Sequence, residues 1–231
     1  MRRACIVLVT LALAGCGSRT DANKAAYARE APASAQRAST DTPDLRPKIV
    51  ILGDSLTAGL GLPVEMAYPT LLQQKVDAAG LKYQIINAGV SGDTSAGGLS
   101  RLDWSLQGDV KILIVALGGN DALRALPVEQ LSDNLSKIID TAQRRNISVV
   151  LAGMEAPTNW GRDYDVSFHK VYPALAARYH VPLVPFLLQG VAGSETLNQA
   201  DGIHPTAAGA RIVADNVWKV LKPLAERLQT S

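Results

Sequence analysis

Two short sequences far apart in the chain carry residues that together could perform nucleophilic catalysis. Ser55 directly follows an apolar run that ends at Gly53, in the sequence IVILGDS. His204 lies in the loop sequence DGIHP, three residues after Asp201. This spacing allows a turn to bring the Asp201 carboxylate to one imidazole nitrogen while the other nitrogen faces outward, as a general base for a serine hydroxyl requires. Each sequence taken alone also fits an ordinary turn, with Ser55 as a cap and His204 as an exposed side chain.

Attack on a carbonyl group also requires hydrogen-bond donors for the developing oxyanion. Gly89 follows a predicted strand, and no side chain obstructs its backbone N–H group. Asn120 follows a tight Gly-Gly turn and carries a side-chain amide. These two residues are the candidate donors, although each alone also fits a turn. Asp93 and Asp121, which stand in the same two loops, are expected to be caps or loop anchors.

Other site classes find little support in the sequence. The two remaining histidines, His169 and His180, lie on a predicted helix, where a surface position or a contact with the helix C-terminus is expected. Three His and two Cys in 231 residues are too few potential ligands to indicate a zinc site, and no HExxH sequence is present. GxSxG and Walker sequences are also absent.

The elements that must position these residues alternate between strand and helix patterns. Short apolar or β-branched runs predict strands at residues 49–52, 83–87, 112–117, 148–151 and 183–186. Apolar residues at helical spacing predict helices around residues 71–76 (closed by Gly80), 131–142, 164–179 (kinked near Pro173) and 206–224 (capped by Thr206). This alternation predicts a parallel five-stranded sheet covered by helices on both faces. Ser55 then lies at the carboxyl end of a strand, where open α/β sheets bind ligands.

Four blocks of the sequence resemble, in order, the conserved blocks of the SGNH (GDSL) hydrolases: GDSL at 53–56, Gly89, GND at 119–121, and DGIH at 201–204. The surrounding sequence, including NAGVSGDTSAGGLSRL and LGGNDALR, is similar to the bacterial thioesterase I/lysophospholipase L1 and arylesterase branch of that family. The resemblance covers residues 48 to 223. It implies an α/β fold of three layers (α/β/α), flavodoxin-like, with a five-stranded parallel sheet.

The resemblance also implies site roles. Ser55 would be the nucleophile, His204 the base and Asp201 its orienting carboxylate. The N–H groups of Ser55 and Gly89 and the side chain of Asn120 would form the oxyanion hole. No metal and no organic cofactor are implied.

A loop that borders the acyl pocket in similar enzymes corresponds here to Met154, Glu155, Ala156 and Pro157, which are therefore the expected substrate-binding residues. Such enzymes often have a basic and a larger aliphatic residue in place of Glu155 and Ala156. The acyl-chain preference therefore does not follow from the resemblance.

The first sixteen residues have the features of a bacterial lipoprotein signal sequence. Arg2 and Arg3 precede an apolar run that is too short to span a bilayer, and the run ends in LAGC at Cys16. This tetrapeptide resembles a lipobox, in which Cys16 becomes the lipidated first residue of the mature chain. The alternative is ordinary cleavage after Ala14, which yields a soluble periplasmic or secreted protein. Residues 17–47, rich in Ala, Ser, Thr and Pro, are expected to be a flexible linker before a domain at 48–231.

Composition limits the partners. The net charge of +2 is accounted for by Arg2 and Arg3, and no basic cluster beyond the pair at 144–145 indicates nucleic-acid binding. We therefore expect a monomeric serine esterase, anchored to the outer membrane and facing the periplasm, that acts on lysophospholipids, aryl or short to medium acyl esters, and thioesters. The alternatives are an envelope-glycan O-deacetylase and a non-catalytic envelope lipoprotein that uses the same fold for binding.

Overall fold

The computed structural model describes residues 44–230. The expected signal sequence with Cys16, and the expected linker as far as residue 43, lie outside the described residues. Within residues 44–230, no helix is both long enough and apolar enough to cross a membrane.

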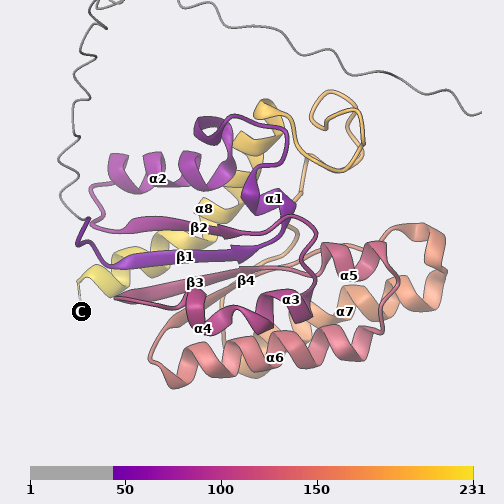
Figure 1. The fold of residues 1–231 in the computed structure, drawn as a ribbon, viewed down its shortest axis with the longest axis horizontal. Helices are drawn as coiled ribbons and strands as arrows, with labels where there is room; N and C mark the ends of the chain where they lie inside the picture. Colours follow the sequence, from indigo (N-terminus) through magenta and orange to yellow (C-terminus); the bar gives the residue numbers. More distant parts are fainter. Residues whose placement is uncertain (1–43, 231) are drawn as a thin grey trace, which may run out of the picture. The chain divides into compact units, whose positions relative to one another are not determined.

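Five parallel strands form one sheet (Figure 1). They are β1 (Lys48–Gly53), β2 (Gln84–Gly89), β3 (Val110–Ala116), β4 (Ser148–Ala152) and β5 (Leu183–Val184). Their order across the sheet is β2-β1-β3-β4-β5, which is the flavodoxin-like arrangement. The predicted fold class and the number of strands are confirmed.

The carboxyl ends of β2 and β5 differ most from the prediction, since β2 ends at Gly89 and β5 at Val184. β2 continues to Gly89 because its pairing with β1 extends to the end, where Gly89 lies opposite Gly53. β5 ends at Val184, so the predicted strand at 183–186 is too long. The next residue is Pro185, which has no backbone N–H to continue a ladder.

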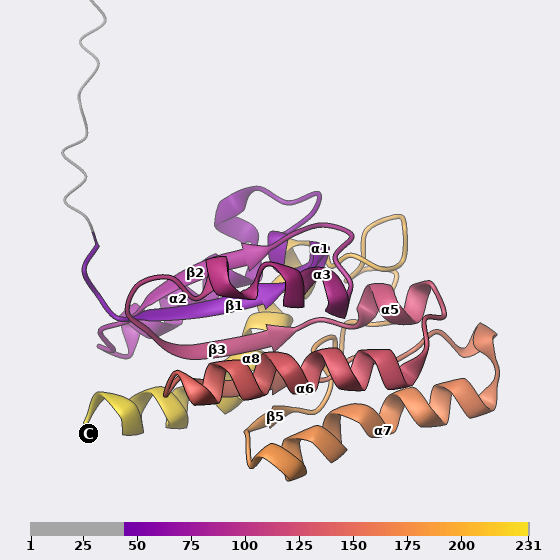
Figure 2. The same ribbon diagram turned by 60° about the horizontal axis from the view of Figure 1, so that its bottom comes forward.

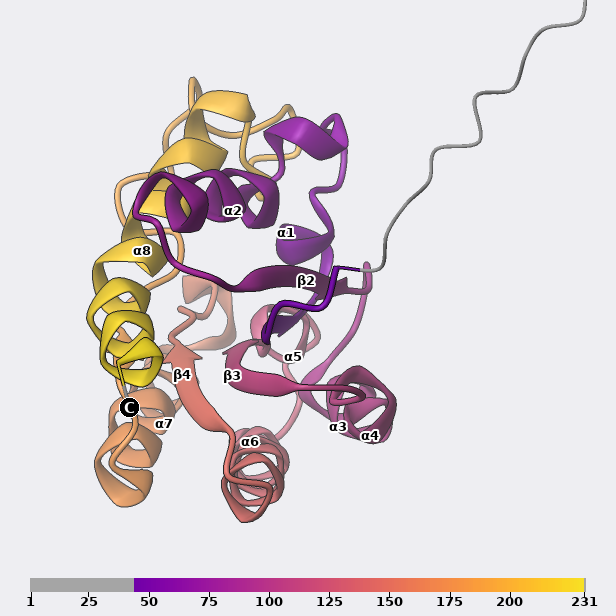
Figure 3. The same ribbon diagram turned by 90° about the vertical axis from the view of Figure 1, so that its left-hand side faces the viewer.

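Helices cover both faces of the sheet. They are α1 (Ser55–Ala58), α2 (Tyr68–Ala78), α3 (Ser95–Ser100), α4 (Leu102–Ser105), α5 (Gly119–Leu123), α6 (Val128–Arg144), α7 (Arg162–Tyr179) and α8 (Ala207–Gln229), with 3-10 turns at Val64–Met66 and Thr158–Trp160. Viewed along the sheet, α2 and α8 lie on one side and α4 and α6 on the other (Figure 3). Gly80 follows α2 with φ +73°, and the Thr206 hydroxyl accepts the N–H of Gly209 at the start of α8, as predicted.

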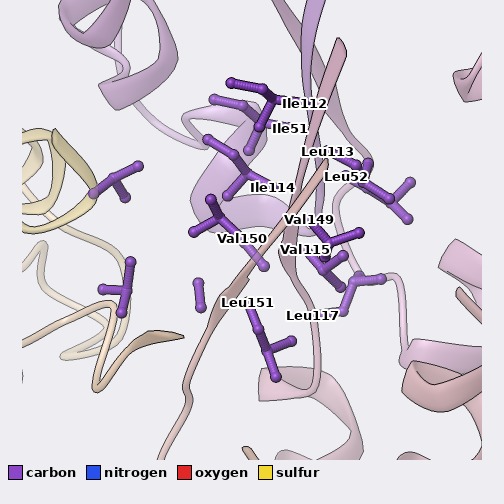
Figure 4. Packing of buried hydrophobic residues seen from close by; sticks show 14 of the residues in the cluster. Ile51, Leu52, Ile112, Leu113, Ile114, Val115, Leu117, Val149, Val150 and Leu151 are labelled. Atoms are coloured by element: carbon purple, nitrogen blue, oxygen red, sulfur yellow. The ribbon is translucent and has the colours of Figure 1, made fainter. Parts of the chain in front are cut away.

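The core is built from the central strands, whose side chains are almost all buried. Aliphatic side chains of β1, β3 and β4 interdigitate, as Figure 4 shows for Ile51, Ile114 and Val150 among others. The predicted apolar face of α6 packs against them, and its five residues from Leu131 to Ala142 are buried. Strands buried on both faces explain the continuous apolar runs in the sequence.

The carboxyl ends of the strands meet one set of loops and short helices. α1 follows β1, α3 follows β2, and α5 follows β3, so all three begin at this edge (Figure 2). In this strand order the chain changes direction between β1 and β3, and ligands of open α/β sheets bind at that switch point. Ser55 begins α1 and Asn120 lies in α5. The fold therefore brings both residues to the expected crevice.

Candidate active site

Ser55 is the first residue of α1, two residues after the end of β1. Asp54 caps the helix, because its carboxylate accepts the N–H of Leu56 at 3.0 Å. The N–H of Ser55 has no acceptor within its own helix, as is general for the first residues of helices. The local sequence thus places a hydroxyl and a free backbone donor together at the strand end.

His204 joins Ser55 to Asp201. Its Nε2 lies 2.7 Å from Ser55 Oγ, and its Nδ1 lies 2.7 Å from Asp201 Oδ2. The second carboxylate oxygen, Oδ1, accepts the backbone N–H groups of Ile203 (2.9 Å) and His204 (3.0 Å). The structure therefore brings Ser55 to His204, 149 positions further along the sequence, and the Asp201 carboxylate both forms the loop and orients the imidazole.

Hydrogen bonds stabilise the ionised form of Asp201. The backbone N–H and the imidazole of His204, followed by the N–H of Ile203, lower the pKa of Asp201 from 3.8 to about 2. The carboxylate is therefore ionised at neutral pH and accepts a hydrogen bond from the Nδ1–H group of His204. Nε2 is then left as the acceptor for the Ser55 hydroxyl.

The environment of Asp54 raises its pKa, whereas that of Asp201 lowers the pKa of that residue. Its side chain is almost completely buried, with 2% exposed. Burial raises its pKa from 3.8 to about 6, a shift that the N–H of Leu56 and the charge of a protonated His204 partly offset. Asp54 Oδ2 also lies 3.3 Å from Nδ2 of Asn120, which links the β1 and β3 loops.

Gly89 does not fit the role predicted for it. Its N–H donates to Oδ1 of Asn87 at 2.9 Å and is therefore not available to a substrate. A Cβ atom at Gly89 would overlap the backbone of Thr57 and Ala58 in α1. Gly89 is thus required for the close approach of α1 to the end of β2, and the prediction that it donates to the oxyanion is corrected.

Gly92 has the available N–H group instead. It is the third residue of a turn over residues 90–93, closed by the Asp93 N–H and the Val90 carbonyl at 3.1 Å. Its φ of +83° is the positive value that the third position of a type II turn requires, which explains the glycine. Among residues 44–230, no hydrogen-bond acceptor is found for its N–H. The sequence SGDT, which follows a strand, could have indicated the role of Gly92, because a glycine in such a turn is expected to have a positive φ.

Asn120 lies beside this turn. Its Nδ2 donates to the Asp93 carbonyl at 2.9 Å and reaches Asp54 Oδ2 at 3.3 Å. An amide nitrogen carries two hydrogens, and the longer contact leaves one of them weakly engaged. The predicted anchoring roles of Asp93 and Asp121 are confirmed, since Asp93 pairs with Arg101 and the buried Asp121 accepts the backbone N–H and the hydroxyl of Ser95.

An apolar groove of about 450 Å³ has Leu56, the neighbour of Ser55, and Ile203, the neighbour of His204, in its lining. It is lined by Leu56, Gly119, Leu123, Met154, Glu155, Ala156, Pro157, Phe186, Leu188, Ala192, Gly202 and Ile203. All four residues of the predicted substrate loop are in this lining. Glu155 is the one ionisable side chain among them, and its carboxylate pairs with Nδ1 of His169 at 2.8 Å. His169 is exposed, as expected, and His180 ends α7 as its C-cap.

Comparison with known proteins agrees with this geometry. The sequence pattern of the GDSL-like Lipase/Acylhydrolase family matches residues 51–212. Esterase TesA of Pseudomonas aeruginosa is 43% identical over 177 residues, which cover 76% of this chain and 88% of the relative. Thioesterase 1/protease 1/lysophospholipase L1 of Escherichia coli is 38% identical, with 76% and 84% covered.

Solved structures give the same result. The crystal structure of TesA superposes with a TM-score of 0.74 at 42% identity and covers 77% of this chain and 99% of the other. The esterase EstA from Pseudoalteromonas, inhibited by monoethylphosphonate, gives 0.73 at 33% identity, with 78% and 98% covered. On this evidence the chain belongs to the GDSL-like lipase/acylhydrolase family, the SGNH hydrolases.

Proposed function

We propose that this protein is a serine ester hydrolase in which Ser55 is the nucleophile and His204 the general base. Asp201 is the carboxylate that orients the His204 imidazole and stabilises its protonated form. The single observation that carries the proposal is the unbroken chain of contacts from Asp201 through His204 to Ser55, each 2.7 Å long. Distances of this length are within the range required for proton transfer in the ground state. The named activities of the relatives, which include esterase and thioesterase, agree with this reaction class.

The reaction follows from these positions. Ser55 Oγ attacks the carbonyl carbon of the ester while its proton passes to Nε2 of His204. The tetrahedral intermediate collapses, the bond to the leaving oxygen or sulfur breaks, and His204 returns the proton to the leaving group. A water molecule then attacks the acyl-enzyme by the same steps, which releases the acid and regenerates Ser55.

The oxyanion of the intermediate would accept hydrogen bonds from the N–H groups of Ser55 and Gly92 and from the side chain of Asn120. The proposal uses Gly92 in place of Gly89 because the Gly89 N–H is already bonded to Asn87. For Asn120, the contact of 3.3 Å with Asp54 is the one that a substrate oxygen would replace. A donor of this kind contributes about 10²- to 10³-fold to kcat.

The groove suggests the substrate class. Eleven of its twelve lining residues are apolar or glycine, which suits a hydrocarbon chain better than a sugar. We therefore propose lysophospholipids, aryl or short to medium acyl esters and acyl thioesters as substrates. An acetylated glycan is the alternative, and hydrolysis of acetyl-xylan at rates above those for a lysophospholipid would favour it.

The cellular setting is also a proposal. The LAGC sequence supports lipidation of Cys16 and attachment of a monomeric enzyme to the outer membrane, facing the periplasm. Metabolic labelling with a palmitate analogue should mark the wild-type protein and not a Cys16→Ser variant. Absence of label on the wild type would favour the soluble periplasmic or secreted form.

Hydrolysis of p-nitrophenyl esters by the wild type, Ser55→Ala and Ser100→Ala tests the proposal. Ser100 is an exposed serine at the end of α3 and serves as the control. We expect Ser55→Ala to lose more than about a thousandfold in kcat, and Ser100→Ala to retain the wild-type value. Activity of Ser55→Ala within tenfold of the wild type would refute the assignment of the nucleophile.

A further inference from the structure

The Arg101 side chain donates three hydrogen bonds to residues at the ends of β1 and β2 and in the turn over residues 90–93. It lies where α3 ends and α4 begins. Its Nη1 donates to the Ala88 carbonyl at 2.8 Å, its Nη2 to the Gly53 carbonyl at 2.8 Å, and its Nε to Asp93 Oδ2 at 2.6 Å. The side chains of Arg101 and Asp93 are each 18% exposed. One partly buried guanidinium thus bonds to three acceptors from three segments of the chain.

The three acceptors lie close to Ser55 and to the turn over residues 90–93, whose relative positions matter for catalysis. Gly53 ends β1, two residues before Ser55. Ala88 lies near the end of β2, just before the turn over residues 90–93, and Asp93 is the last residue of that turn. The Gly53 carbonyl also accepts the N–H of Val90 at 3.0 Å, so the turn and the end of β1 already meet at this atom.

We propose that Arg101 is a positioning residue for ester hydrolysis, which fixes the turn that presents the Gly92 N–H relative to Ser55. The inference rests on the proposed function, in which that N–H binds the oxyanion. Arginine suits the task because its planar guanidinium has donors pointing in fixed directions, whereas a lysine ammonium cannot reach three separated acceptors at once. Bonds to the charged Asp93 are also stronger than bonds between neutral groups.

The turn is attached on its other side by Asn120. The Asn120 amide donates to the Asp93 carbonyl, while Arg101 bonds to the Asp93 carboxylate. Loss of Arg101 leaves the turn its bonds from Asn120 to the Asp93 carbonyl, from Val90 to Gly53 and from Arg124 to the Gly92 carbonyl, but removes the bond to the Asp93 carboxylate. Neither Asp201 nor His204 contacts Arg101, so the proton-transfer pair should remain intact. The expected defect is confined to stabilisation of the oxyanion.

Steady-state hydrolysis of a p-nitrophenyl ester by Arg101→Gln provides the test, with Arg145→Gln as the matched control. Arg145 is an exposed arginine at the end of α6 that pairs with Asp103 in α4. We expect kcat of Arg101→Gln to fall at least tenfold with KM within twofold of the wild type, and Arg145→Gln to be unaffected. Arg101→Lys should keep most of the defect because it restores the charge but not the three bonds.

A second readout separates positioning from a general loss of structure. An alkyl trifluoromethyl ketone forms a tetrahedral adduct with an active serine and mimics the transition state, whereas the carboxylic acid product does not. Its inhibition constant should rise by the same factor by which kcat/KM falls, while the inhibition constant of the acid stays constant. Asp93→Asn, which removes only the charge on the acceptor, should show the same pattern to a smaller degree and can replace Arg101→Gln if that variant does not fold.

Two results would overturn the inference. One is a kcat of Arg101→Gln, or of Asp93→Asn in its place, within twofold of the wild type. The other is an unchanged inhibition constant for the ketone in the impaired variant. A wild type whose esterase activity does not depend on Ser55 would instead refute the proposed function, so the two failures are distinguishable.

Discussion

Asp54 is expected to destabilise the folded protein at neutral pH, and Asp54→Asn should remove that effect. The carboxyl group is 2% exposed and has a pKa of about 6, raised from 3.8 mainly by burial. Asparagine has nearly the same shape and can still accept the N–H of Leu56, so the cap of α1 is retained. The substitution therefore removes the charge while changing little else.

The sign and size follow from the pKa values. Between pH 3.8 and about 6 the folded protein binds more protons at Asp54 than the unfolded chain does. The contribution of this group to stability is therefore greatest below pH 3.8, and it is lost as the pH rises through about 6. The difference between the two pKa values corresponds to about 3 kcal/mol, at about 1.4 kcal/mol per pH unit.

Urea unfolding of the wild type and Asp54→Asn at intervals from pH 4 to pH 8 measures this effect, with the exposed Asp133→Asn as control. The free energy of unfolding of Asp54→Asn minus that of the wild type should rise by about 2 to 3 kcal/mol over this range, almost all of it below pH 7. Any fixed cost of placing the new amide beside Asn120 cancels in this change. A difference that stays constant to within about 0.5 kcal/mol, or that falls with rising pH, would refute the reasoning.

Three further substitutions test the site. Gly92→Ala places a side chain at φ +83°, which should displace the N–H of the strained turn and lower kcat about 100-fold in ester hydrolysis, whereas an unchanged kcat would show that the turn does not require glycine here. Gly89→Ala places a methyl group against Ala58 and should lower the free energy of unfolding in urea by about 1 to 3 kcal/mol; full stability would contradict the close approach of α1. Glu155→Gln removes the charge from the groove and should raise kcat/KM for a hemisuccinate ester about tenfold relative to the matching butyrate ester; an unchanged ratio would show that Glu155 does not influence the acyl group.

The sequence was sufficient to predict the fold and the contacts among Ser55, His204 and Asp201. Buried parallel strands consist of continuous apolar runs, so the ends of β1 and β3 could be located, and with them Ser55 and Asn120. The three-residue spacing between Asp201 and His204 is a local feature, and the structure forms the expected turn. These predictions succeeded because each depends on neighbouring residues or on where a strand ends.

The remaining features depend on contacts between distant residues. Whether Gly89 or Gly92 has a free N–H is decided by the Asn87 side chain and by the conformation of one turn. The role of Arg101 depends on three acceptors, of which Gly53 lies 48 positions away. The ionisation of Asp54 depends on its burial in the packed domain, which the sequence GDS does not reveal.

The covalent intermediate allows the most direct test of the central claim. The protein is treated with a fluorophosphonate at neutral pH, digested, and mapped by peptide mass spectrometry. The proposed mechanism predicts one phosphonylated residue, Ser55, with labelling slowed in His204→Gln and absent in Ser55→Ala. Labelling of a different serine, or esterase activity that persists after Ser55 is fully modified, would contradict it.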